Sequence, residues 1–167
     1  MLINFSGLSG TGKTTIAREL ALQIGAVYLR IDSIEQSMRE SGAVTVPLND
    51  AGYSVGYAIA EDNLRLGRTV IADSVNPLKV TREAWCDVAN RAHVGALEIE
   101  VKCSDPSTHR LRVEGRVADI SGLRPPTWDE VCSREYQPWD HDHLVLDTAV
   151  YPVEQCFYMI REILRKG

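Results

Sequence analysis

Eight residues near the start of the chain combine the side chains and the spacing that a phosphate-binding loop needs. Residues Gly7 to Thr14 read GLSGTGKT, which satisfies the pattern G-x-x-x-x-G-K-[ST]. The glycines let the backbone fold tightly around an anion with its N–H groups pointing inward, and Lys13 adds a positive charge. The hydroxyl of Thr14 can bind Mg²⁺. The pattern therefore predicts a site for the phosphates of a nucleoside triphosphate.

The segments on either side of this loop have the patterns of a strand and a helix. The apolar run Met1 to Phe5 precedes the loop, and a helical pattern follows from Thr14 to Gln23. A glycine turn that only joins a strand to a helix would not need Lys and Thr at this spacing, so we favour the phosphate site. The residues expected to contact the nucleotide here are Gly7, Leu8, Ser9, Gly10, Thr11, Gly12, Lys13, Thr14 and Thr15.

Asp32 follows the second apolar run, Val27 to Ile31, and is a candidate general base. An aspartate with the ordinary pKa of about 3.9 is ionised at neutral pH and can accept the proton of an attacking hydroxyl. Alternatively, Asp32 caps a helix that begins at Ser33, a role that would not exclude catalysis.

Asp73 closes a third apolar run, as in a Walker B position, and could hold Mg²⁺ through a water molecule. The next residue is Ser74, where motor-type ATPases usually have a glutamate that activates water. This difference disfavours a hydrolase and favours transfer to a bound alcohol.

Four arginines lie in the segment that follows the fourth apolar run. Arg112 and Arg116 lie four residues apart and would share a face of a helix. We expect both to be catalytic residues of a lid that closes over the triphosphate, with Arg112 also contacting the nucleotide, because arginines there stabilise transition-state charge. The alternative is a solvated basic helix face. Arg110 and Arg124 fit either interpretation.

Apolar runs alternate with helix-length segments along the whole chain, which predicts an α/β fold with a parallel sheet. The predicted strands are Leu2 to Ser6, Val27 to Ile31, Thr69 to Asp73, Leu97 to Cys103 and Leu144 to Asp147. The predicted helices are Lys13 to Gln23, Ser33 to Arg39, Tyr53 to Leu66, Val80 to Arg91, Ser107 to Arg116, Thr127 to Arg134 and Val153 to Arg165.

Local sequence signals also predict loops and helix caps. Glycine and proline indicate loops at Ser41 to Asn49 and Asp119 to Pro126. Asp50 and Thr127 are expected to cap the helices that follow them. Ligands of such sheets sit beyond the carboxyl ends of the strands, where Asp32 and Asp73 fall.

Length, charge and cysteine spacing narrow the class of protein. The 167 residues have the length of one domain, and no segment has the length of a membrane span. The net charge of -5 disfavours a nucleic-acid partner, although a local basic groove would be compatible with one. The four cysteines are widely separated, so we expect buried thiols in a cytoplasmic protein; the oligomeric state has no sequence signal.

Taken together, these segments resemble the small P-loop kinases related to the nucleoside monophosphate kinases, nearly from end to end. The resemblance rests on the loop Gly7 to Thr15, on Tyr28 to Ile34, on Val70 to Asp73 and on the basic segment His109 to Arg116. It implies a P-loop NTPase fold, a three-layer α/β/α domain over residues 1–167 with a five-stranded parallel sheet of order 2-3-1-4-5. It also implies a helical lid at about 105–126, and ATP with Mg²⁺ as cofactors.

Within that group, Asp32 and its neighbours distinguish subfamilies. Asp32-Ser33-Ile34 resembles the V-D-S-L stretch of chloramphenicol phosphotransferases, in which the aspartate deprotonates the substrate. Polynucleotide 5′-kinases have an arginine three residues after that aspartate, and adenylylsulfate kinases have D-G-D-N-x-R; this chain has Glu35 at the arginine position. The resemblance therefore favours a neutral or cationic alcohol as acceptor.

The function that the sequence favours is ATP-dependent transfer of a γ-phosphate to a hydroxyl of a small molecule. The alternatives are a polynucleotide 5′-hydroxyl kinase, suggested by Arg30 beside Asp32, and a nucleotide-binding switch or ATPase without an acceptor. We expect the acceptor pocket to be shaped by Ser41 to Asn49, Ser74 to Asn76, Tyr53 and Tyr57, although the two tyrosines are more typical of helix packing.

Overall fold

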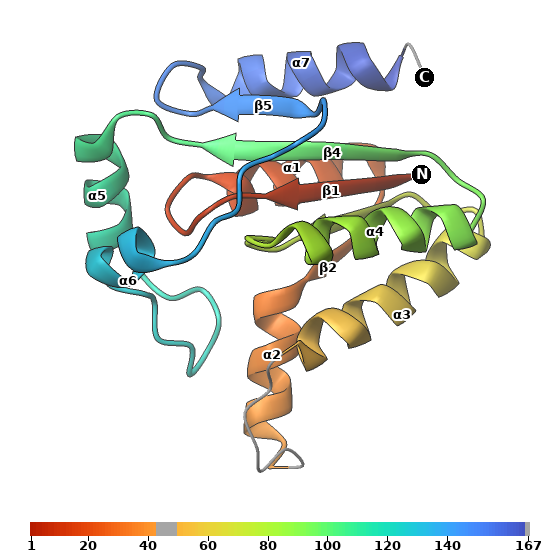
Figure 1. Ribbon diagram of the computed structural model, residues 1–167, viewed down its shortest axis with the longest axis horizontal. Helices are drawn as coiled ribbons and strands as arrows, with labels where there is room; N and C mark the ends of the chain where they lie inside the picture. The colour runs from red at the N-terminus through yellow and green to blue at the C-terminus, as the bar shows by residue number, and fades with distance from the viewer. Residues whose placement is uncertain (43–49, 166–167) are drawn as a thin grey trace.

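Five parallel strands form a single sheet at the centre of the molecule (Figure 1). The computed structural model describes residues 1–42 and 50–165. The order β2-β3-β1-β4-β5 confirms the one implied by the resemblance. The strands are β1 (Leu2–Ser6), β2 (Val27–Arg30), β3 (Val70–Asp73), β4 (Ala96–Lys102) and β5 (Leu144–Asp147).

Seven helices occur in the described residues, and each corresponds to a predicted helix. They are α1 (Lys13–Ile24), α2 (Ile31–Glu40), α3 (Ala51–Arg65), α4 (Lys79–Arg91), α5 (Pro106–Glu114), α6 (Trp128–Ser133) and α7 (Val153–Leu164). None of these helices combines the length and the apolar character needed to cross a lipid bilayer.

The structure corrects the expected N-terminal caps of two helices and confirms that of a third. Helix α2 starts directly after β2, so Asp32 lies in its first turn and does not cap it; the capping position is Arg30. Asp50 precedes α3, but its side chain makes no capping hydrogen bond. Thr127 does cap α6, in a capping box with Glu130. Residues 43–49 of the loop expected at Ser41 to Asn49 lie outside the described residues, whereas 119–126 is a loop as predicted.

The core consists of one apolar cluster on each face of the sheet, which gives the three layers. Ile3 and Phe5 of β1 pack with α1 and α7, and Leu2 packs on the opposite face with α3 and α4. All five residues of β1 are buried, as expected for a central parallel strand. The core thereby fixes the carboxyl end of β1, where the glycine loop begins.

The prediction of buried thiols is confirmed for one of the four cysteines. Cys156 is buried against the core, but Cys132 is exposed and Cys86 and Cys103 are half-buried. All four are free thiols. Cys132 lies on the short helix α6, which buries only Val131, so its neighbours have no core to enter.

The glycine loop is in direct contact with α5. The ring Nε2 of His109 lies 2.7 Å from the carbonyl oxygen of Ser9. Gly10 has φ +84°, and a β-carbon there would lie only 2.5 Å from Cγ2 of Val113 on α5. The absence of a side chain at Gly10 therefore lets α5 rest on the loop.

We expect Gly10→Ala to lower the free energy of unfolding by about 2 to 4 kcal/mol, because the substitution adds a steric conflict to a left-handed backbone. Gly25→Ala is the matched control: its φ is +64°, but the added β-carbon would meet nothing within 4 Å. The control should cost about 1 kcal/mol. Urea unfolding followed by circular dichroism measures both, and equal losses would contradict the packing argument.

Candidate active site

A cavity of about 320 Å³ lies over the glycine loop and contains most of the predicted nucleotide-binding residues. Its walls are formed by Gly10, Gly12, Lys13, Thr14, Thr15, Arg112, Arg116, Val117 and Asp119. Lys13 is 6% exposed, and its ammonium group makes no hydrogen bond or ion pair with any other described residue. An ammonium group without an anionic partner on the wall of a cavity makes that cavity suited to an anion. We refer to it as the phosphate cavity.

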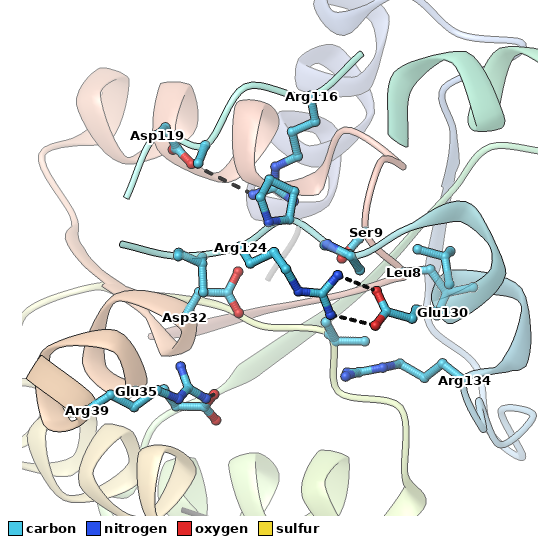
Figure 2. A pocket seen from close by; sticks show the side chains of 16 residues that line it. Leu8, Ser9, Asp32, Glu35, Arg39, Arg116, Asp119, Arg124, Glu130 and Arg134 are labelled. Atoms are coloured by element: carbon cyan, nitrogen blue, oxygen red, sulfur yellow. Dashed lines mark hydrogen bonds and ion pairs between the residues drawn. The ribbon is translucent and has the colours of Figure 1, made fainter. Parts of the chain in front are cut away.

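A second cavity, of about 330 Å³, adjoins the first and contains Asp32. Leu8 and Ser9 of the glycine loop line it too, and Figure 2 shows the carboxylate of Asp32 pointing into it. Arg116 and Asp119 line both cavities, so the two spaces meet at these side chains. We refer to the second space as the Asp32 cavity.

Gly7 and Thr11 line neither cavity and instead support the loop from inside. The N–H of Gly7 donates to the carbonyl oxygen of Val75 at 3.0 Å. The hydroxyl of Thr11 donates to the carbonyl oxygen of Leu8 at 2.9 Å, which closes the turn. These two residues shape the loop, whereas a direct nucleotide contact by their side chains stays a prediction.

Arg112 is fixed at the phosphate cavity by the loop after β5. Its Nη1 donates to Oγ1 of Thr148 at 2.7 Å, and its Nη2 donates to the Thr148 carbonyl oxygen at 3.2 Å. The Thr148 hydroxyl in turn donates to the carbonyl oxygen of Thr11 at 2.8 Å. This chain of contacts holds the Arg112 guanidinium at the cavity that Lys13 also lines, a position that sequence spacing could not define.

The reason given for pairing Arg112 with Arg116 was wrong, although both reach the phosphate cavity. Helix α5 ends at Glu114 and Gly115 follows as its C-cap, so Arg116 does not share a helix face with Arg112. It lies in the α5–α6 loop, residues 115–127, which brings it over the cavity from another direction.

The two remaining arginines have carboxylate partners within their own segments. Arg110 pairs with Glu114 at 2.8 Å, and Arg124 forms a two-pronged ion pair with Glu130 at 3.1 and 2.5 Å. Figure 2 shows the second pair inside the Asp32 cavity. Arg110 does not line either of the two cavities.

Asp73, the predicted metal-binding residue, is buried at the end of β3 beside the glycine loop. The hydroxyl of Tyr28 donates to its Oδ2 at 2.6 Å. Burial, together with the Asp73 carboxylate, raises the pKa of Tyr28 above its ordinary range, so the hydroxyl stays a donor. The Oδ1 of Asp73 has no hydrogen-bond partner among the described residues.

The wall of the Asp32 cavity carries as many arginines as carboxylates. The arginines are Arg39, Arg116, Arg124 and Arg134, and the carboxylates are Asp32, Glu35, Asp119 and Glu130. Glu35 accepts a hydrogen bond from Arg39 at 3.1 Å, while burial raises the pKa of its carboxyl. The charge of Glu35 is thus already offset. The expectation that Glu35 selects a neutral or cationic acceptor has no support in this wall.

The cavity walls also differ from the expected acceptor pocket. Neither Tyr53 nor Tyr57 lines the Asp32 cavity. Tyr57 packs edge-on against Trp85 and donates to the Thr81 carbonyl oxygen, and Tyr53 accepts from the Asn76 N–H, so both serve packing. The α5–α6 loop and α6 supply most of the wall instead. Of the segment Ser74 to Asn76, Val75 alone is a lining residue.

Sequence reasoning did not predict several contacts that hold the site together. Arg30 and Asp119 are ion-paired across it, Tyr28 binds Asp73, and Thr148 binds Arg112. Each partnership joins segments distant in the chain; the Arg30 and Asp119 positions are 89 residues apart. The one available signal was that Arg30 is a charged residue within the apolar run Val27 to Ile31.

Comparison with known proteins connects this geometry to a family. The model of the AAA_33 family, described as an AAA domain, matches residues 2–126. The adenylyl-sulfate kinase of Synechococcus sp. (strain JA-3-3Ab) is 24% identical over 171 residues, which cover 96% of this chain and 92% of that protein.

Two solved structures share the fold over nearly the whole chain. A protein of Chloroflexus aurantiacus j-10-fl has a TM-score of 0.73 at 22% identity and covers 99% of this chain and 96% of its own. The APS kinase CysC of Mycobacterium tuberculosis, in complex with AMPPNP and APS, has a TM-score of 0.69 at 17% identity and covers 98% and 96%. Since the family model matches well over half of the residues, the chain belongs to the AAA_33 family and has a P-loop kinase fold.

Proposed function

We propose that this protein is an ATP-dependent phosphotransferase that moves the γ-phosphate to a hydroxyl of a small molecule. The observation that carries the proposal is the position of Asp32 in one cavity with Leu8 and Ser9 of the glycine loop. A carboxylate on one side of a cavity and a phosphate-binding loop on the other leave room for an alcohol between them. The similarity to an adenylyl-sulfate kinase supports a phosphotransferase of this kind.

The phosphate cavity would hold the triphosphate by charge and by backbone N–H groups. Lys13 and Arg112 supply cations, and the N-terminal end of α1 begins at Lys13. Phosphoryl transfer needs little covalent chemistry from the protein beyond this positioning and charge neutralisation. Arg116, which lines both cavities, would stabilise the charge that develops on the transferred group.

Asp32 would act as the general base. Its side chain is 37% exposed, and the nearest cation is Nη2 of Arg30, at 3.9 Å. This distance exceeds a hydrogen bond, so the carboxylate keeps lone pairs free for a hydroxyl. The oxygen of the acceptor would then attack the γ-phosphorus as its proton passes to Asp32.

Thr14 and Asp73 are the oxygen donors that would hold Mg²⁺. Thr14 lines the phosphate cavity, whereas Asp73 lines neither cavity but has a free Oδ1 while Tyr28 binds its Oδ2. Magnesium prefers oxygen ligands and retains several waters, which suits one hydroxyl and one carboxylate. Bound there, the ion would neutralise charge on the β- and γ-phosphates.

Two observations argue against the competing functions. Arg30, whose position beside Asp32 suggested a nucleic-acid kinase, is buried and paired with Asp119, so it offers no exposed basic groove. An ATPase without an acceptor would use a carboxylate to activate water, but it would not need a second cavity of about 330 Å³ to hold that water. The Asp32 cavity therefore favours an acceptor.

We expect Asp32→Asn to lower phosphate transfer by about two to four powers of ten, because the amide cannot accept the hydroxyl proton. Transfer of the γ-phosphate from ATP to a panel of small alcohols, read by mass spectrometry, measures this change. The matched control is Glu35→Gln, which alters the other carboxylate of α2 in the same cavity and should lower kcat far less. Undiminished transfer by a folded Asp32→Asn variant would remove Asp32 from the mechanism.

Lys13→Ala should lower kcat by roughly two to three powers of ten, as expected for the loss of one preorganised charge stabiliser. Lys79→Ala provides the control, because Lys79 is a surface residue whose partner is Asp140. The same mass-spectrometric assay applies, with circular dichroism to verify folding. Equal turnover in the two variants would show that Lys13 does not act on the phosphates.

A further inference from the structure

Asp119 lies where the phosphate cavity and the Asp32 cavity meet, because it lines both of them. A phosphoryl group that passes from a nucleotide in the first cavity to an alcohol in the second must cross this boundary. Asp119 belongs to the α5–α6 loop, and no helix or strand contains it. A carboxylate from a loop therefore occupies the region that an anion would cross.

Three arginines converge on the Asp119 carboxylate. Arg30 binds it with two hydrogen bonds, from Nη1 at 2.6 Å and from Nη2 at 3.0 Å. Arg116 lies 3.7 Å away and Arg18 lies 3.9 Å away. The hydrogen bonds from Arg30 lower the pKa of Asp119, so the group is an anion. This arrangement is a binding site for an oxyanion, occupied by a side chain of the protein itself.

Arg30 needs an anionic partner at this position. Its side chain is only 6% exposed, and its Nε has no hydrogen-bond partner. If the α5–α6 loop moved away and nothing replaced Asp119, a buried cation would lose its main partner, at a large cost in free energy. An incoming anion that takes over the two hydrogen bonds removes this cost. The loop and such an anion would therefore exchange places on Arg30.

Arg30 also lies close to the proposed base. Its Nη2 is 3.9 Å from Oδ2 of Asp32, and it ends β2 directly opposite Asp73 on β3. The same guanidinium is thus near both carboxylates that the proposed transfer uses. Planar arginine groups with two parallel donors match the oxygens of a phosphoryl group as well as those of a carboxylate.

We propose that Arg30 is a further catalytic residue, which binds the oxygens of the transferred phosphoryl group, and that Asp119 holds this site until the nucleotide displaces it. The inference rests on the proposed function in taking the γ-phosphate as the group transferred. In the step itself, the acceptor oxygen forms a bond to the γ-phosphorus, the bond from that phosphorus to the bridging oxygen breaks, and ADP leaves with the electron pair. The acceptor proton goes to Asp32, and Arg30 stays bound to the phosphoryl oxygens throughout.

The test compares nucleotides that share the ADP part except for the β–γ bridging atom and differ in what occupies the γ position. Dissociation constants are measured by calorimetry for Mg²⁺ with ADP, AMPPNP, and ADP plus aluminium fluoride, which mimics the group in transfer. The variants are Asp119→Asn, Arg30→Met and the double variant. Glu61→Gln and Arg91→Met are matched controls, since Glu61 and Arg91 form an ion pair at 2.8 Å between α3 and α4. No acceptor is needed, so the result is independent of whether an alcohol is ever phosphorylated.

Asp119→Asn should tighten AMPPNP by roughly tenfold and leave ADP almost unchanged, because the competing charge at the γ position is gone. Arg30→Met should weaken the aluminium fluoride complex by roughly ten- to a hundredfold relative to ADP alone. In the double variant the gain from Asp119→Asn should vanish, which is the sign that the two residues share one anion. Both control variants should bind all three ligands like the unmodified protein.

The opposite results would overturn the proposal. Weaker or unchanged AMPPNP binding by Asp119→Asn would show that Asp119 only holds the α5–α6 loop in place. If Arg30→Met binds ADP plus aluminium fluoride as tightly as the unmodified protein does, Arg30 does not bind the transferred group. If Arg30→Met does not fold, Arg30→Lys replaces it, since lysine keeps the charge but loses the paired hydrogen bonds, and it should weaken the aluminium fluoride complex in the same direction.

Discussion

In a sheet whose strands are all parallel, the segments that follow the strands all leave at the same edge, so polar side chains from several strands can meet there, outside the apolar core. The carboxyl ends of β1, β2 and β3 deliver the glycine loop, Asp32 and Asp73 to this edge. The same constraint leaves the edge open to solvent, since no strand covers it. Helix α5 and the α5–α6 loop supply that cover, and they divide the space into a phosphate cavity and an Asp32 cavity.

Much of the fold could be predicted because its signals are local. Apolar runs marked all five strands, and the structure shifts each boundary by one residue at most. The sheet order was not local information and came from the resemblance. The errors arose at helix ends, where a single residue decides whether the helix starts or stops. Gly115 ends α5 before Arg116, and α2 starts directly from β2, so that Asp32 lies within a helix turn and not before it.

The site was less predictable than the fold, because its contacts join residues that are far apart in sequence. The pairing of Arg30 with Asp119 depends on where the α5–α6 loop lies, which no spacing or periodicity encodes. The same holds for Thr148, which orients Arg112. Motif reasoning predicted which residues carry chemistry. It could not identify which residues hold them, since holding depends on packing between distant segments.

The ion pairs at this edge suggest how the site selects its ligands. A ligand anion would have to replace a carboxylate that is already paired with an arginine, so this replacement matters more than the net charge of the site. Most cations around the Asp32 cavity already have a carboxylate partner, as Arg39 has Glu35 and Arg124 has Glu130. At Arg30, which is buried, a ligand that enters must replace Asp119 and match its geometry, because a buried charge left without a partner costs more than the pair contributes. Lys13 differs, since it is buried without any such partner among the described residues. An anion bound at Lys13 displaces nothing, whereas an anion at Arg30 must displace Asp119. The phosphates would consequently fill the Lys13 end first, and only a group that extends beyond it would reach the pair at the boundary.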